Sequence, residues 1–190
     1  LNQTVVFPAK TMIAAAMNPC KCGFFPDLGK CRCTPTQIRR YLNRVSGPFL
    51  DRIDIGVEVP RQDLGMMAAE KSIDEGSFPQ AEQRNSSAVM RARVMEARAR
   101  QEKRFADESI SYNSQMTRRQ IEEYCRLSGE DAVFLEKVER QQGISARGHG
   151  KILKVARTLA DLDGQAEIGR TQLAEAIGFR SFEKKYWGSL

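Results

Sequence analysis

Two closely spaced pairs of cysteines are the residues of this chain best suited to chemistry. Cys20 and Cys22 are followed, after eight intervening residues, by Cys31 and Cys33, and glycines and a proline lie between the pairs. Such a loop can fold back and bring four thiolates to one point. Zn²⁺ binds a tetrahedral set of thiolates, and a four-cysteine site is structural because no coordination position stays open. The spacing therefore predicts a structural zinc site.

Two other states of these cysteines are compatible with the spacing. Disulfides are disfavoured because nothing marks the chain as secreted. Unconnected thiols are disfavoured because four cysteines within fourteen positions are not expected by chance. The fifth cysteine, Cys125, falls on the apolar stripe of a predicted helix, which indicates a buried and inert thiol.

A polar residue ends the apolar run that precedes the cysteines. Residues 11–17 are small and apolar, the pattern of a strand buried on both faces, and Asn18-Pro19 ends the run. An open α/β sheet presents polar groups to a ligand at the carboxyl ends of its strands, which makes Asn18 a candidate site residue. An Asx turn before the proline explains the local pattern equally well.

Arg52 stands at the entry to a second predicted strand. Apolar residues alternate over residues 53–59, and Pro60 ends the pattern. Asp51 and Asp54 lie beside the arginine, so an ion pair within the chain is one interpretation. A guanidinium offered to a phosphate is the other.

The order of these motifs resembles that of the magnesium-chelatase-like AAA+ ATPases of the ComM (YifB) type. The resemblance covers nearly the whole chain and resumes after the middle of the sequence. The motifs are Met-Asn-Pro-Cys-x-Cys-Gly (17–23), Cys-x-Cys-Thr-Pro (31–35), Gln-Ile-x-x-Tyr (37–41), Ser-Gly-Pro-x-Leu-Asp-Arg-Ile-Asp (46–54), Ser-Ala-Arg-Gly (145–148) and Lys-Ile-Leu-Lys-Val-Ala-Arg-Thr (151–158).

The resemblance implies roles for three residues. Asn18 corresponds to sensor 1, which orients the water that attacks the γ-phosphate. Arg52 corresponds to the arginine finger, which reaches the nucleotide of the neighbouring subunit, and Arg147 to sensor 2, which binds the nucleotide from the helical lid. These residue types suit phosphoryl transfer, which is catalysed by positioning and by charge placed on the phosphoryl oxygens.

The resemblance also implies partners. The expected protein is an ATP- and Mg²⁺-dependent ring motor, a hexameric homo-oligomer because a finger acting in trans requires a neighbour. It is expected to act on DNA as a branch-migration helicase in natural transformation. One alternative is a chelatase motor that drives Mg²⁺ insertion into a tetrapyrrole, although the cysteine loop favours the helicase type. Another is a non-catalytic module that binds zinc and nucleic acid.

Two elements of such an ATPase are missing from the sequence. The phosphate-binding P-loop, Gly-x-x-x-x-Gly-Lys-Ser/Thr, does not occur, because neither Gly29-Lys30 nor Gly150-Lys151 has the required neighbours. No apolar run ends in Asp-Glu, so a Walker B element is missing as well. We therefore expect the carboxyl-terminal portion of a longer protein, which alone does not hydrolyse ATP.

Composition agrees with a globular chain in a reducing compartment. Of its 190 residues, 41% are apolar and 28% are charged, as in ordinary soluble proteins. No apolar run approaches the roughly 20 residues of a membrane span, and no signal pattern opens the chain, so a cytoplasmic location is expected. The net charge of +6 permits an anionic partner without requiring one.

The predicted organisation has two parts. Glycine, serine and proline punctuate residues 61–80 and mark a boundary. We expect an α/β fold class for residues 1–64, the closing half of an AAA+ core with its zinc insertion. Residues 65–80 are the expected linker, and residues 81–190 an all-α helical lid. Periodicity and capping signals predict helices within residues 36–45, 82–105, 117–128, 130–142, 145–163 and 171–179.

The longest predicted helix is strongly basic. Residues 84–104 hold seven basic and two acidic residues, and Arg91, Arg98 and Arg100 are candidate DNA contacts. A solvated helix face or a subunit contact explains the charge as well, because no aromatic residues interleave with it.

Arg147 falls in the first turn of another helix, where a cation opposes the macrodipole and needs an anion. A nucleotide phosphate or a carboxylate of a neighbouring helix can supply it. The single histidine, His149, is expected at the surface or in a polar contact.

Overall fold

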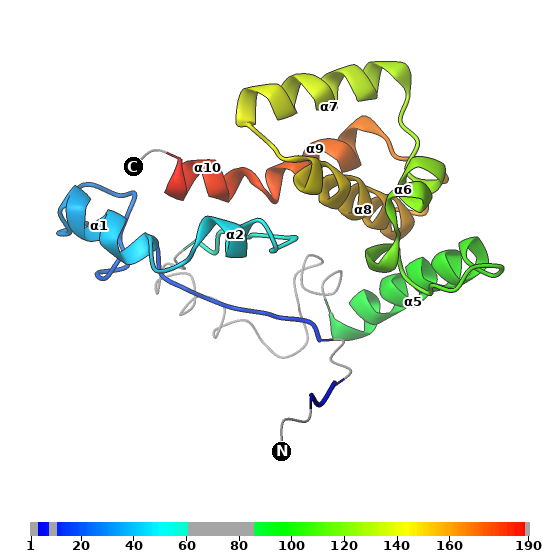
Figure 1. The fold of residues 1–190 in the computed structure, drawn as a ribbon, viewed down its shortest axis with the longest axis horizontal. Coiled ribbons are helices and arrows are strands. Elements are labelled where there is room, and N and C mark those ends of the chain that lie inside the picture. Colours follow the sequence, from blue (N-terminus) through cyan, green and yellow to red (C-terminus); the bar gives the residue numbers. More distant parts are fainter. Residues whose placement is uncertain (1–3, 8–10, 61–85, 189–190) are drawn as a thin grey trace, which may run out of the picture. The chain divides into compact units, whose positions relative to one another are not determined.

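The structure is a computed structural model that describes residues 4–7, 11–60 and 86–188 (Figure 1). The chain divides between Val45 and Ser46 into two compact units, which we call the cysteine unit and the helical unit. The elements of the described residues are α1 (Pro35–Leu42), α2 (Gly47–Leu50), α5 (Ser87–Arg104), the 3₁₀-helix η1 (Asn113–Gln115), α6 (Arg118–Tyr124), α7 (Gly129–Gln142), α8 (Ala146–Leu162), α9 (Arg170–Gly178) and α10 (Ser181–Trp187).

Side-chain caps explain where the long helices begin. Ser86, Ser128 and Ser145 each accept a hydrogen bond from the third residue of the helix that follows, which satisfies a backbone donor that the helix leaves free. Thr117 forms a full capping box with Gln120. At the other end of α7, Gly143 adopts a left-handed conformation with φ of 68°. These signals are local, and the helices predicted from them are confirmed.

The core of the helical unit forms around α8, which lies in its middle (Figure 1). α8 packs against α9, α5, α6 and η1, and α9 packs in turn against α7 and α10. Cys125 is only 3% exposed and belongs to this core, and burial raises its pKa to about 11, so the predicted inert thiol is confirmed. The other core residues are Phe105, Met116, Leu135, Ile152, Leu153, Ala156, Ala160, Ile168, Leu173, Ala176 and Ile177.

A buried carboxylate joins three elements of this unit. Asp161 on α8 is 0% exposed and accepts hydrogen bonds on both oxygens from Arg104 of α5. Asn113 of η1 donates a further bond of 2.8 Å, and Arg157 lies 3.2 Å away on the preceding turn of α8. A buried charge is tolerated only when its partners replace the lost hydration.

The predicted strands are not formed in the described residues. Residues 11–17 and 53–59 have no strand there, and Met12, Val57 and Val59 are 93%, 67% and 88% exposed. A strand needs a neighbouring strand for its backbone hydrogen bonds, and the described part of the chain offers none. The α/β class of the first part therefore stays a prediction. The linker predicted at residues 65–80 lies outside the described residues.

Residues 46–60 belong to the helical unit, although the sequence grouped them with the preceding segment. None of the helices that the structure describes is both long enough and apolar enough to cross a membrane.

We predict that Asp161→Asn lowers the free energy of unfolding of the 190-residue chain by about 3 kcal/mol, because it leaves the buried Arg157 and the largely buried Arg104 without their counter-charge. Urea unfolding followed by circular dichroism measures the change. Glu136→Gln is the matched control, because Glu136 forms only an exposed pair with Arg140, and its effect should stay below about 0.5 kcal/mol. Equal effects of both substitutions contradict the assigned role of Asp161.

Candidate functional site: a cysteine cluster and an arginine turn

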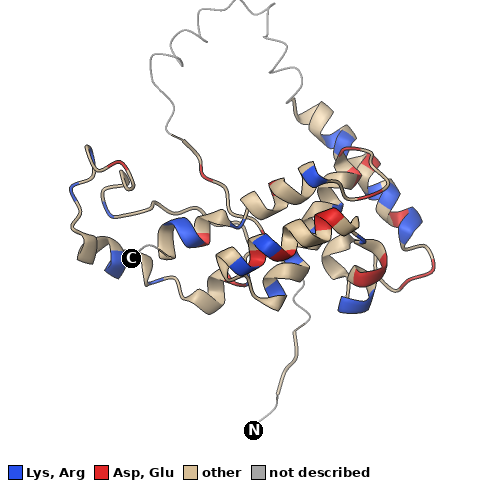
Figure 2. Cartoon of the chain, turned by 90° about the horizontal axis from the view of Figure 1, so that it is seen from above, with Lys and Arg blue, Asp and Glu red and all other residues tan. Residues whose placement is uncertain are grey.

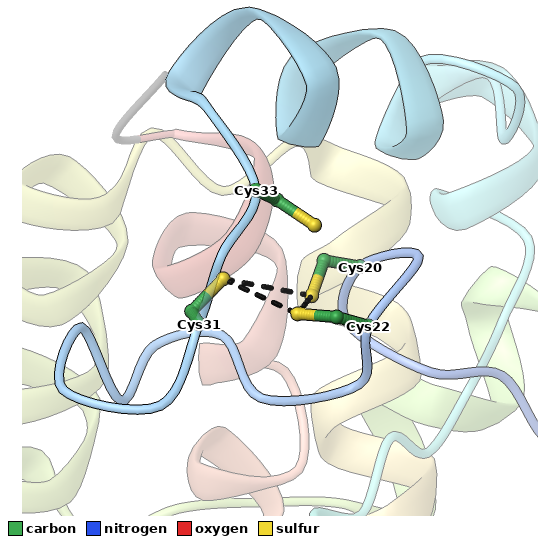
Figure 3. Close-up of side chains that lie close together, drawn as sticks. All are labelled: Cys20, Cys22, Cys31 and Cys33. Carbon is green, nitrogen blue, oxygen red and sulfur yellow. Dashed lines mark hydrogen bonds between the residues drawn. The ribbon is translucent and has the colours of Figure 1, made fainter.

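The four cysteines of the cysteine unit converge on one point (Figure 3). Their Sγ atoms all lie within 4.8 Å of one another. The Sγ atom of Cys20 is 3.4 Å from that of Cys22 and 3.8 Å from that of Cys31, and Cys22 and Cys31 are 3.6 Å apart. A tetrahedron with metal–sulfur bonds of about 2.3 Å has sulfurs about 3.8 Å apart. All of these separations exceed the roughly 2.05 Å of a disulfide, so the cluster fits a metal ion.

Local turns explain how the sequence brings these cysteines together. Gly23, with φ of 77°, donates its backbone N–H to the Cys20 carbonyl at 3.1 Å and reverses the chain after the first pair. The Cys31 N–H bonds to the Asp27 carbonyl at 2.8 Å, which returns the chain to the second pair. Thr34 then begins α1 with a capping box. The loop is thus closed at both ends by its own backbone.

The thiols of this cluster differ in pKa. Backbone hydrogen bonds from Phe24 and Arg32 lower the pKa of Cys22 to about 6. The backbone of Cys33 also lowers the pKa of Cys31, but burial and the Cys22 thiol outweigh it and raise that pKa to about 11. Four adjacent thiolates repel one another, and a divalent cation at their centre offsets the repulsion.

The second site is the turn after α2, residues 51–54, which we call the arginine turn. Arg52 is exposed, and its Nη1 donates to the Pro48 carbonyl of its own segment. Within the described residues no carboxylate pairs with Arg52. The neighbouring acids are engaged by α8, since Asp51 accepts from Ser145 at 3.1 Å and Asp54 pairs with Lys151 at 2.9 Å. The ion pair that the sequence allowed for Arg52 is therefore not formed.

The helices also hold the backbone of the arginine turn. Lys151 of α8 donates to the Arg52 carbonyl, and Arg180, which is 6% exposed, donates to the Ile53 carbonyl at 2.8 Å. The Gly56 N–H bonds to the Phe179 carbonyl at 2.9 Å. Neither Lys151 nor Arg180 was a candidate from the sequence. Lys151 lies in a matching motif, but no local signal shows that it reaches the turn.

Arg147 lies in the first turn of α8 and pairs with Asp51 at 3.4 Å. The sequence allowed either a nucleotide phosphate or a carboxylate as the partner of Arg147, and in the structure the partner is the carboxylate of Asp51. The pair is weak because the Arg147 side chain is 58% exposed, so an arriving anion can compete for it. Arg52 and Arg147 thus belong to one unit. Asn18 lies in the cysteine unit, where it is exposed after the irregular residues 11–17.

The α5 arginines differ in what they contact. Arg91 is exposed, the Arg98 guanidinium lies 5.4 Å above the Tyr112 ring, and Arg100 donates to the Asp161 carbonyl at 3.1 Å. Arg100 therefore helps to cover the carboxyl end of α8, which the sequence alone did not indicate. His149 contacts Glu139 at 2.7 Å, the polar contact that was expected.

Comparison with known proteins identifies the family of the chain. The family model described as "Magnesium chelatase, subunit ChlI C-terminal" matches residues 84–180, and "Magnesium chelatase, subunit ChlI" matches residues 1–67. The chain therefore belongs to the magnesium-chelatase-like family. Among curated proteins it is 39% identical over 180 residues to competence protein ComM of Haemophilus influenzae, with 95% of this chain and 32% of that protein covered.

Other relatives have similar coverage. YifB of Escherichia coli is 39% identical over 180 residues, and an uncharacterized protein of Mycobacterium tuberculosis is 31% identical over 174 residues. The chain spans about a third of the length of these relatives, 33% and 32% respectively.

We predict that the purified chain contains about one Zn²⁺ per molecule, because four thiolates complete a tetrahedral site. Cys31→Ser should reduce the bound metal at least ten-fold when zinc is measured by mass spectrometry after dialysis. Cys125→Ala, which removes the one thiol outside the cluster, is the control and should retain the metal. A metal-free chain with four titratable thiols would contradict the prediction.

Proposed function

We propose that this chain is part of an AAA+ ATPase motor that acts on DNA, to which it contributes an arginine finger, two nucleotide sensors and a zinc loop. Membership of the magnesium-chelatase-like family supports the ATPase, and the similarity to a protein named competence protein ComM supports the work on DNA. One observation carries the proposal. Arg52 presents an exposed guanidinium on a turn whose own carboxylates are bound elsewhere.

In this proposal the arginine turn serves the nucleotide of a neighbouring subunit in a ring. Arg52 places its guanidinium on the γ-phosphate oxygens, where negative charge is redistributed in the transition state. Arg147 exchanges its exposed contact with Asp51 for a phosphate oxygen. Asn18 orients the attacking water in its own subunit. ATP and Mg²⁺ supply the phosphoryl group, and the proposal assigns their P-loop and Walker B carboxylates to sequence outside these 190 residues.

The helical lid is the support of the finger in this mechanism. Lys151 and Arg180 hold the carbonyls of two successive residues of the turn, so a displacement of α8 or of the junction between α9 and α10 moves Arg52 with it. Phosphoryl transfer is sensitive to such displacement, since a misplacement of about 1 Å can cost about a hundred-fold in rate. The lid can thereby transmit its position to the neighbouring nucleotide.

A magnesium-chelatase motor is the second candidate, because the matched models are described as chelatase subunits. Such a motor uses the same nucleotide chemistry, but its function does not require DNA binding. The cysteine cluster and the basic residues beside it favour the DNA motor. DNA binding therefore separates the two candidates.

We predict that Arg52→Ala, in the protein that joins this chain to its P-loop segment, lowers kcat for ATP about 10³-fold and changes nucleotide affinity less than two-fold. A steady-state phosphate-release assay and nucleotide titration measure the two effects. Arg140→Ala is the matched control because Arg140 pairs only with Glu136 at the surface. Unchanged turnover of the Arg52 variant would assign the residue to its contact with Pro48 alone.

Mixing subunits tests whether the finger acts in trans. Asn18→Ala and Arg52→Ala subunits should each be inactive alone, yet a mixture should recover about a quarter of the turnover, because one in four random interfaces joins an intact Asn18 to an intact Arg52. A mixture as inactive as either variant contradicts action across the interface.

Lys151→Met should lower kcat about ten-fold with KM unchanged, because the finger loses its position while the nucleotide site stays intact. Lys151→Arg should restore most of the turnover. Lys137→Met, on the exposed face of α7, is the control. A change in KM alone would show that Lys151 does not position the finger.

A further inference from the structure

The cysteine unit holds a second concentration of positive charge that the sequence analysis did not single out. Residues 11–45 contain one acidic residue, Asp27, and six basic residues, which gives a local surplus of five beside a net charge of +6 for the whole chain. Residues 84–104 have an equal surplus, seven basic against two acidic. The basic residues of the cysteine unit are Lys21, Lys30, Arg32, Arg39, Arg40 and Arg44.

The two basic segments differ in whether carboxylates pair with their basic side chains. On α5, Arg104 is bound to Asp161, Arg93 lies 3.8 Å from Asp163, and Arg100 lies 4.0 Å from Glu96. α5 holds six basic residues, coloured blue in Figure 2, and two acidic residues, Glu96 and Glu102. Three of the six basic residues of α5 therefore lie within 4.0 Å of a carboxylate.

The arginines at the carboxyl end of α1 and just beyond it are not compensated in this way. Arg39, Arg40 and Arg44 are exposed, and no carboxylate of the described residues pairs with them. The one acid of the segment, Asp27, lies 3.8 Å from Lys30. Arg40 lies in the last turn of α1 and Arg44 two residues beyond its end, and like charges that line one hollow repel. An anion bound between them would relieve that repulsion.

These arginines line a hollow of the cysteine unit. With Thr36 and Asn43 they surround a shallow depression of about 340 Å³, and no acidic residue of the described part of the chain lines it. Thr36, Arg39 and Arg40 lie on α1, Asn43 and Arg44 directly follow its last residue, and Ile38 and Leu42 are buried. Guanidiniums, a hydroxyl and an amide are the side chains that bind phosphate oxygens, and guanidiniums bind them bidentately.

We propose that these five residues of α1 and its carboxyl-terminal turn, which we call the arginine stripe, bind the phosphodiester backbone of DNA. The inference rests on the proposed action on DNA and assigns the surface that performs it. None of the described residues places an aromatic ring in the lining of the hollow, so the contact is to the backbone and carries no base preference. Cys33 directly precedes Thr34, the cap of α1, so metal binding fixes the start of the helix that carries the arginine stripe.

The test replaces Arg39, Arg40 and Arg44 together with glutamine. Binding of fluorescein-labelled 30-mer DNA, single- and double-stranded, is followed by anisotropy at several salt concentrations. We expect affinity to fall at least ten-fold and the slope of log K against log salt to decrease in magnitude by about 2 to 3, as three lost phosphate contacts imply. Zinc content and circular dichroism confirm that the variant is folded.

The matched control replaces Arg119, Arg126 and Arg140 with glutamine. It removes the same charge from exposed positions of the helical unit, and its affinity should change less than two-fold. Equal losses in both triple variants would show diffuse attraction and overturn the arginine stripe as a site.

Two further outcomes separate this inference from the function on which it rests. If the unmodified chain and the protein that contains it both fail to bind DNA, the proposed action on DNA fails. If DNA binding is normal in the α1 variant while ATP turnover is lost, the arginine stripe serves a nucleotide triphosphate, and only the present inference fails.

Discussion

The helical unit depends on the buried carboxylate of Asp161. This residue has no exposure to water, and Arg104, Arg157 and Asn113 replace its hydration with charge-assisted hydrogen bonds. Because the partners come from α5, η1 and α8, the carboxylate sets the orientation of these three elements together. An apolar residue of similar size could fill the same space, but it would not specify which helix faces which.

The amino-terminal end of α8, opposite Asp161, contacts the arginine turn. Lys151 lies ten residues before Asp161, about 15 Å along the helix. Cations near the start of a helix oppose its macrodipole, and here Arg147 and Lys151 find their anions in Asp51 and Asp54. The same two contacts that satisfy α8 hold the arginine turn. Arg52 stands between the two acids in the sequence and is the one ionic side chain of the turn that α8 leaves unengaged.

The cysteine unit has a small apolar core. Its buried apolar side chains in the described part of the chain are Cys20, Ile38 and Leu42, which is a small core for a segment of this length. Small folds commonly need a metal or a disulfide in addition to apolar burial. The cysteine cluster supplies the donor set for a metal, and the helix that it precedes carries the uncompensated arginines. The candidate metal ligands and the exposed arginines thus lie on either side of the first turn of one short helix.

Local chemistry in the sequence determined much of this protein. Serine and threonine caps, apolar stripes and the spacing of the cysteines predicted the helices of the lid and the metal cluster, because each depends on residues close together in the chain. The buried state of Cys125 followed from its helical stripe. The motifs also carried the family assignment.

Tertiary structure decided what depends on distant partners. A small apolar run is compatible with a buried strand, but it needs a neighbour to pair with, and the described residues 11–17 and 53–59 have none. The contacts that hold the arginine turn join residues 94 to 127 positions apart, so Lys151 and Arg180 gave no local signal. Residues 11–45 and 84–104 have the same surplus of positive charge, so counting charges does not show which segment has unpaired arginines. Which arginines remain available depends on where the carboxylates lie in space, because an ion pair is a property of distance and not of sequence order.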